Sequence, residues 1–177
     1  MRSGVPVKWI EDRREHLMAS SSGTDRVSHR EMALRKDGTI LGIRVRLYDN
    51  VGAYLRSPEP ACTYARISSF PSGYHVRNIA IDAYNVTTNK SLTGPNRGYG
   101  CQQIYFELER AIDLAAERLK MDPAEIRLKN LIPSDTMPYT SATGGIYDSG
   151  DYPKAFRMAL EVAGYQDLRK RQAKARA

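Results

Sequence analysis

The clearest pattern in the chain is a stretch in which apolar and polar positions alternate. Between residues 40 and 48, the odd-numbered positions from Ile43 to Leu47 are apolar and the positions between them are polar. This period of two predicts a strand with one buried and one solvated face. A second strand is predicted at 31–35, and the Asp37-Gly38 pair between the two segments is typical of a tight hairpin turn. We therefore predict an antiparallel hairpin, with a bend or bulge at 49–52.

Two further segments have the composition of strands. Residues 78–87 are rich in β-branched side chains and alternate in the same way. Near the start of the chain, residues 6–12 place apolar Val7 and Trp9 on either side of Lys8, and we predict a strand there as well.

Helical periodicity dominates the second half of the chain. From residue 101 to 120, apolar residues recur three and four positions apart, which predicts an amphipathic helix. Asp122 followed by Pro123 marks the start of a second helix, and Asp151 caps a third that Gly164 ends. Strands and helices together predict an α+β fold, a mixed sheet with packed helices. The apolar stripe of the long helix consists of Ile104, Leu108, Ala111, Ile112, Ala115 and Leu119.

The formal net charge of +7 is unevenly distributed. Residues 166–177 hold five Lys or Arg and one Asp, so this basic tail carries +4 of the total. One interpretation is a solvated helix end. The alternative is a stand-alone basic α+β module that binds nucleic acid or an acidic partner. No aromatic residue lies among the tail's charges, although a platform for stacked bases needs them.

Few residues suggest conventional active-site chemistry. Cys62 and Cys101 lie far apart without metal-ligand spacing, which favours a reduced cytoplasmic protein over a disulfide scaffold. No apolar run reaches the length of a membrane span. The three histidines are scattered and no Ser/His/Asp set is evident, so we assign no metal ligand and no catalytic residue. Glu107 and Glu109 are interpreted as acids that favour the N-terminal half of the long helix; the alternative is that one of them points back at the glycine-rich turn before it.

The main chemical candidate is the turn at residues 94–100, which directly precedes the long helix. It contains three glycines together with Asn96, Arg97 and Tyr99. Glycines let backbone N–H groups approach a ligand, a helix N-terminus favours an anion, and an arginine offers a planar fork for oxyanions. The glycine spacing matches neither a dinucleotide fingerprint nor a P-loop. A plain strand-to-helix turn with a solvent-facing arginine is the other interpretation.

The chain resembles the molybdenum-cofactor-binding large subunit of the xanthine dehydrogenase superfamily, which includes aldehyde oxidases and carbon monoxide dehydrogenases. The resemblance extends from about Gly4 to Ala163 and is strongest for the carbon monoxide dehydrogenase-like branch. Because the family's subunit is much longer, residues 1–177 would be a partial molybdopterin-binding domain, truncated at both ends. The resemblance rests on four segments in the same order: GVPVKWIEDRREHLMAS, DGTILGIRVRLYDNVGAY, TNKSLTGPNRGYG and ELERAIDLAAERLKMDPAEIRLKNLI.

The resemblance implies roles for the residues of the turn. Arg97 would lie at the molybdenum cofactor, Gly98 would keep the backbone close to it, and Tyr99 would line the substrate pocket. Asn96 occupies a position that is aromatic in xanthine dehydrogenases, so the pocket shape should differ. The implied cofactor is molybdopterin in its cytosine dinucleotide form. Electrons would pass to 2Fe-2S clusters and FAD on a small iron–sulfur subunit and a medium flavin subunit.

Two departures from the family pattern refine this expectation. Carbon monoxide dehydrogenases place a copper-binding cysteine directly after the loop arginine, whereas this chain has Gly98 there, and Cys101 lies three residues further on. The implied reaction is therefore hydroxylation of aldehydes or N-heterocycles with water. The family's upstream glycine-rich cofactor motif and its C-terminal general-base glutamate are absent, so the isolated fragment is expected to be inactive.

Overall fold

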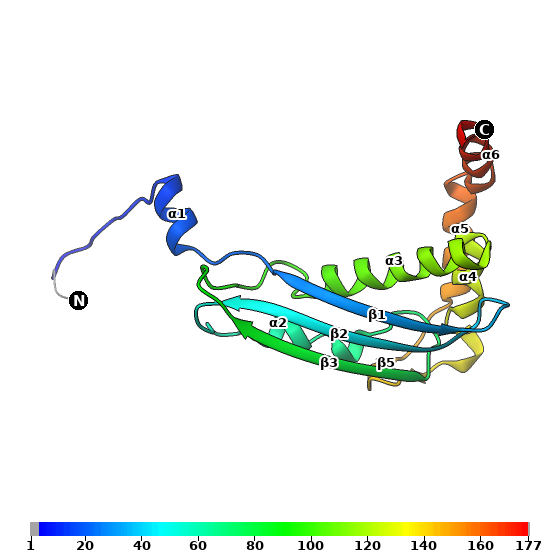
Figure 1. Cartoon of the computed structure of the whole chain (residues 1–177), viewed down its shortest axis with the longest axis horizontal. Helices are drawn as coiled ribbons and strands as arrows, with labels where there is room; N and C mark the ends of the chain where they lie inside the picture. The colour runs from blue at the N-terminus through cyan, green and yellow to red at the C-terminus, as the bar shows by residue number, and fades with distance from the viewer. Residues whose placement is uncertain (1–3, 177) are drawn as a thin grey trace.

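A three-stranded sheet organises the protein, whose residues 4–176 are described by a computed structural model (Figure 1). The first two strands are antiparallel, and the third pairs in parallel with the other edge of the second, so the order is β1-β2-β3. A parallel pair needs a crossover, and the chain makes it through 53–77. The strands are β1 (Arg26–Leu34), β2 (Ile40–Gly52) and β3 (Asn78–Thr87).

The predicted hairpin and the predicted strand at 78–87 are confirmed. Gly38 has a φ of +85°, the left-handed conformation that the hairpin turn requires. The odd-numbered residues from Ile43 to Leu47 are buried, and the residues between them face outward. The irregularity expected at 49–52 is a register shift in the pairing of β2 with β3, between Asn50 and Gly52.

The long helix α3 (Cys101–Leu119) covers one face of the sheet and runs in the same direction as β1 (Figure 1). Leu108 and Ile112 are completely enclosed, and burying each stabilises the fold by about 2 kcal/mol. The predicted apolar stripe is thus the core side of the helix. The core cluster comprises Ile40, Ile43, Val45, Leu47, Phe70, Tyr74, Val76, Ile104, Leu108, Ile112, Ala115, Ala116 and Ile126.

Both predicted helix caps are confirmed. Asp122 accepts a hydrogen bond from the Ala124 amide at 2.7 Å at the start of α4 (Pro123–Asn130). Asp151 accepts from the Lys154 amide at 2.9 Å at the start of α5 (Tyr152–Val162). Each cap satisfies amide groups that have no partner inside the helix, which stabilises the helix by about 1 kcal/mol.

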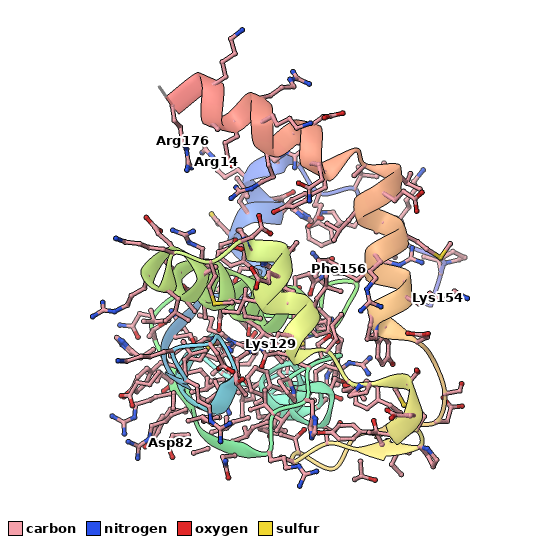
Figure 2. The ribbon with its side chains drawn as sticks, turned by 90° about the vertical axis from the view of Figure 1, so that its right-hand side faces the viewer. Arg14, Asp82, Lys129, Lys154, Phe156 and Arg176 are labelled. Carbon is pink, nitrogen blue, oxygen red and sulfur yellow. The ribbon has the colours of Figure 1, made fainter. Side chains whose placement is uncertain are left out.

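The basic tail forms most of a separate helix, α6 (Tyr165–Arg176). Arg169 Nε lies 3.0 Å from Asp122 Oδ2, so α6 is tied to the start of α4. Figure 2 shows α5 and α6 standing away from the sheet, with Phe156 on the side of α5 that faces the rest of the protein and Lys154 on the other side. No described residue of these two helices is fully buried.

The predicted strand at residues 6–12 is wrong. This stretch pairs with no strand among residues 4–176, and Trp9 and Ile10 are 69% and 75% exposed. Asp12 instead caps α1 (Arg13–Ala19) through a capping box with Glu15. Alternation makes a strand only where a neighbouring strand supplies hydrogen-bond partners, and no described segment supplies them here.

The remaining elements are short. The region between β2 and β3 holds two helical pieces, and the segment after α4 holds a single turn and a two-stranded hairpin. Within the described part of the chain, no helix has both the length and the apolar character that crossing a bilayer needs. The short elements are α2 (Ala61–Tyr64), η1 (Ile67–Ser69), η2 (Ser134–Thr136), β4 (Tyr139–Thr140) and β5 (Ile146–Tyr147).

Candidate functional site

The turn at 94–100 lies at the end of the sheet where β3 ends and β1 begins (Figure 1). Its first residue is held by the segment before β1, because the Gly94 amide donates to the Ser22 carbonyl at 3.1 Å. The Ser22 amide donates in turn to the Leu92 carbonyl at 2.8 Å. Its last residue, Gly100, contacts Cys62 of α2. Three segments that are distant in sequence therefore meet at the turn.

The backbone of the turn is left-handed at three consecutive residues. The φ angles are +100° at Gly98, +53° at Tyr99 and +87° at Gly100. Two overlapping turns produce this path: the Tyr99 amide donates to the Asn96 carbonyl at 2.9 Å, and the Cys101 amide donates to the Gly98 carbonyl at 3.1 Å. A bulky residue such as Tyr99 adopts this conformation at a cost of about 1–2 kcal/mol. Strained backbone of this kind clusters at functional sites.

The turn presents free hydrogen-bond donors. The Arg97 side chain is exposed and forms no hydrogen bond or ion pair within residues 4–176. The Gly98 amide likewise donates to no acceptor in that range. The backbone beside them is fixed, because the Gln102 side-chain amide donates to the Arg97 carbonyl and the Arg97 amide donates to Asn96 Oδ1 at 2.8 Å. A guanidinium and an amide are thus held open to an anion.

The start of α3 adds to the positive character of the turn. Gly100 is the N-cap residue and has no side chain with which to cap the helix, and the first turn of α3 contains no acidic residue. The partial positive charge of the helix N-terminus is therefore not offset by the helix itself. Glu107 and Glu109 lie further along and bind other groups: Glu107 pairs with Arg30, and Glu109 Oε2 lies 2.8 Å from Arg127 Nε.

Tyr99 lies partly buried beside the α2 region. Partial burial raises the pKa of its hydroxyl, and the nearby Cys62 and Glu59 raise it further. Tyr99 is thus partly buried, whereas Arg97 is exposed.

A buried polar network lies behind the turn. Arg26, Asp49 and Asn85 form one rung across the three strands, since Arg26 is the register partner of Asp49 and Asp49 is that of Asn85. Arg26 donates to both Asp49 carboxylate oxygens at 2.6 Å. The Thr63 hydroxyl, from α2, donates to Asp49 Oδ2 at 2.6 Å and lies 2.6 Å from the Asn85 side-chain amide oxygen. Arg26 Nη2 also donates to the Cys62 carbonyl at 3.4 Å.

Burial and pairing set the charge states in this network. Burial opposes the charge on Arg26, but the hydrogen bonds to Asp49 and the negative charges of Asp49 and Glu107 together outweigh this effect and raise the pKa of the guanidinium. Burial raises the pKa of the Cys62 thiol to about 12, with a further contribution from Glu59. Cys62 is therefore a neutral, structural thiol.

The sequence analysis did not identify this network, although it contains a signal for it. Asp49 continues the odd-numbered series that begins with the buried apolar residues of β2, so the alternation predicts that its side chain faces inward. A carboxylate at an inward position requires a cationic or hydrogen-bonding partner. Arg26, Ser28 and Arg30 are the matching polar residues on the inner face of β1.

Metal-binding side chains are not grouped anywhere in residues 4–176. No three His, Cys, Asp or Glu side chains there lie close enough together to hold an ion.

Comparison with known proteins decides the family. A sequence model of the molybdopterin cofactor-binding domain matches residues 1–131. The chain belongs to this family. The family assignment confirms the resemblance inferred from the four ordered segments, and the neighbouring structures confirm the α+β fold.

Relatives of this molybdopterin cofactor-binding domain are oxidoreductases by name. The chain is 38% identical to the carbon monoxide dehydrogenase large chain of Afipia carboxidovorans, over 96% of this chain and 21% of the relative. It is 34% identical to the 6-hydroxypseudooxynicotine dehydrogenase complex subunit gamma of Paenarthrobacter nicotinovorans, over 93% and 21% respectively.

Solved structures agree with the sequence relatives. The crystal structure of the Cu,Mo-CO dehydrogenase superposes with a TM-score of 0.90 at 34% identity, covering 99% of this chain and 22% of that one. Quinoline 2-oxidoreductase from Pseudomonas putida 86 superposes with a TM-score of 0.87 at 29% identity, covering 96% and 22%. The chain thus spans about a fifth of the length of each of these relatives.

Proposed function

We propose that this molybdopterin cofactor-binding domain forms one wall of the molybdenum site in the large subunit of a molybdenum hydroxylase. The turn at 94–100 would face the cofactor, with Asn96, Arg97, Gly98 and Tyr99 as the contacting residues. The observation that carries this proposal is the Arg97 guanidinium, which has no partner among residues 4–176, on a turn at the N-terminus of α3, which no side chain caps.

The chemistry of the turn fits the group. Molybdopterin carries phosphate, and an arginine, an open amide and a helix N-terminus are the donors that bind phosphate and other oxyanions. Gly98 has no side chain between its free amide and a ligand. The absence of an acid from the first turn of α3 removes a source of repulsion.

Within that site the residues of this chain would bind the cofactor and orient the substrate. When bound, the cofactor supplies two-electron oxidation of a substrate carbon with water as the source of oxygen. Arg97 would hold the anionic cofactor, Gly98 would allow close backbone approach, and Tyr99 would form part of the substrate pocket. We assign no general base to residues 4–176 and propose that the base lies in another part of the subunit.

The proposed substrates are aldehydes or N-heterocycles. The names of two relatives support this class: quinoline 2-oxidoreductase, and the nicotine 6-hydroxylase large subunit of Paenarthrobacter nicotinovorans, which is 30% identical. Gly98 supports it as well, because a glycine supplies no thiolate for copper at the position directly after Arg97.

The greater length of the relatives supports an assembly in which this chain is one part of a larger subunit. We place the chain with the remainder of the large subunit, a 2Fe-2S small subunit and an FAD medium subunit in the cytoplasm, with molybdopterin cytosine dinucleotide as the cofactor form. The remainder of the subunit would cover the exposed apolar side chains near α1 and on α5, among them Trp9, Ile10, Met158 and Val162.

The test is the metal content and turnover of the full-length subunit purified with its partners. We expect about one molybdenum and no copper per large subunit, with oxidation of quinoline or benzaldehyde and none of carbon monoxide. A complex that lacks molybdenum would contradict the proposal. A complex with both molybdenum and copper that oxidises carbon monoxide would contradict the substrate class alone.

A further inference from the structure

The hydrogen bonds that fix the exposed part of the turn are local. Within residues 4–176, Arg97 and Gly98 form hydrogen bonds to Asn96, Cys101 and Gln102, all close in sequence. Anchors from outside the turn lie at its two ends, at Gly94 and at Gly100. The position of the turn therefore depends on what holds the partners of those two glycines.

The anchor at Gly100 is a contact with backbone. A Cβ atom at this position would lie 2.1 Å from the Cys62 carbonyl oxygen, a distance that no side-chain movement could relieve. Gly100 is buried and is the N-cap residue of α3. The location of the Cys62 carbonyl thus limits where the turn and the start of α3 can lie.

The Cys62 carbonyl is held by the buried network. Arg26 Nη2 donates to this carbonyl, and Thr63, the next residue in α2, donates to the same Asp49 carboxylate that binds Arg26. The Arg26 and Asp49 side chains are 1% and 5% exposed, so both bonds lie away from competing water. Asp49 is itself fixed in the middle strand of the sheet.

We propose that Arg26, Asp49 and Thr63 are positioning residues for the molybdenum site. They fix α2 to the sheet, α2 fixes Gly100 through the Cys62 carbonyl, and Gly100 fixes the turn that carries Arg97 and Tyr99. This inference rests on the proposed function of the turn. None of the three positioning residues need touch cofactor or substrate.

Replacement of Thr63 tests the positioning role most directly. Thr63→Val keeps the shape of the side chain and removes the hydroxyl that joins α2 to Asp49, whereas Thr63→Ser keeps the hydroxyl. The assembled enzyme would be reduced with dithionite, and its molybdenum content and molybdenum(V) paramagnetic resonance signal would be measured. We expect Thr63→Val to retain molybdenum but shift or split the signal, and Thr63→Ser to restore the wild-type signal. Turnover should fall about tenfold to a hundredfold in Thr63→Val, which is the usual effect of mutating residues that support a metal site from behind.

A matched control distinguishes a displaced turn from a general loss of fold stability. Asp122→Ala removes the α4 cap and the contacts with Tyr165 and Arg169, beyond the far end of α3. The 19 residues of α3 place it about 28 Å from Gly100. This variant should lower the melting temperature and leave the resonance signal unchanged. If Thr63→Val fails to assemble, the molybdenum(V) signal is measured in Arg26→Lys instead. This variant keeps the positive charge but loses the paired donors of the guanidinium.

Two results have distinct meanings. An unchanged signal in Thr63→Val and Arg26→Lys, with a lowered melting temperature, would overturn the positioning role and leave the proposed function intact. Absence of molybdenum from the wild-type complex would overturn the proposed function itself.

Discussion

Gly100 packs against the carbonyl oxygen of Cys62 so closely that a Cβ atom at residue 100 would lie 2.1 Å from that oxygen. This contact joins the turn before α3 to α2, and through Thr63 and Arg26 to the centre of the sheet. The glycine is therefore required for two reasons, its φ of +87° and the space it leaves. The two requirements can be separated by experiment.

Gly100→Ala should destabilise the chain by more than left-handed backbone alone explains. Gly144 has the same φ of +87° but no atom within 4 Å of an added Cβ, so Gly144→Ala measures the conformational cost by itself. We expect about 1–2 kcal/mol for Gly144→Ala and a larger loss for Gly100→Ala in urea unfolding of the 177-residue chain. Equal losses would show that the contact with Cys62 is not tight.

Glu107→Gln should be strongly destabilising, because it leaves the buried Arg30 without its anion. The Arg30 side chain is 9% exposed and also lies 5.3 Å from the centre of the Phe70 ring. Burial lowers the pKa of the Arg30 guanidinium, and its hydrogen bonds to Glu107 only partly offset this effect. Loss of one partner of such a pair costs about 3–5 kcal/mol.

An exposed ion pair supplies the control for Glu107→Gln. Asp82 lies on the outer side of the sheet (Figure 2), 3.5 Å from Arg46. Asp82→Asn should change the free energy of unfolding by no more than about 1 kcal/mol, since both side chains are solvated. Similar costs for the two variants would contradict the burial argument.

Alkaline pH should destabilise the chain. Burial raises the pKa of Cys62 from 9.0 to about 12 and that of Tyr147 from 10.0 to about 12, and it also raises that of Tyr74. Unfolded chains lose these protons first, so the stabilisation is complete below about pH 9 and falls as pH rises toward 12. The free energy of unfolding, measured by urea titration at pH 8, 9.5 and 10.5, should decrease in that order. Tyr147→Phe should reduce the slope of the unfolding free energy against pH above pH 10. An unaltered slope in this variant would show that Tyr147 does not contribute to the loss of stability.

Local pattern was enough to predict the elements of the core. The alternation in β2, the period of α3 and the caps at Asp122 and Asp151 each depend on neighbours in sequence, and each was confirmed. The segment at 6–12 failed for the opposite reason, because a strand needs a distant partner that alternation does not specify.

The sequence predicted the turn of the candidate site but not the buried network behind it. The glycines, Arg97 and Tyr99 of the turn are contiguous, so the turn could be recognised, and its roles at a cofactor stay predictions. The network behind it comes from β1, β2, β3 and α2, and a register across three strands is set by tertiary pairing. Inward-facing Asp49 was the one local sign that such a network exists.

The central claim is that Arg97 binds the molybdenum cofactor, and the most direct measurement is the molybdenum content of Arg97→Gln in the full-length assembled enzyme. Arg110→Gln, at an exposed position on α3, the helix that follows the turn, is the matched control. We predict that Arg110→Gln retains the wild-type molybdenum content, and that Arg97→Gln loses most of its molybdenum or shows an altered molybdenum(V) signal while the subunits remain assembled. Wild-type content and an unchanged signal in Arg97→Gln would contradict the account.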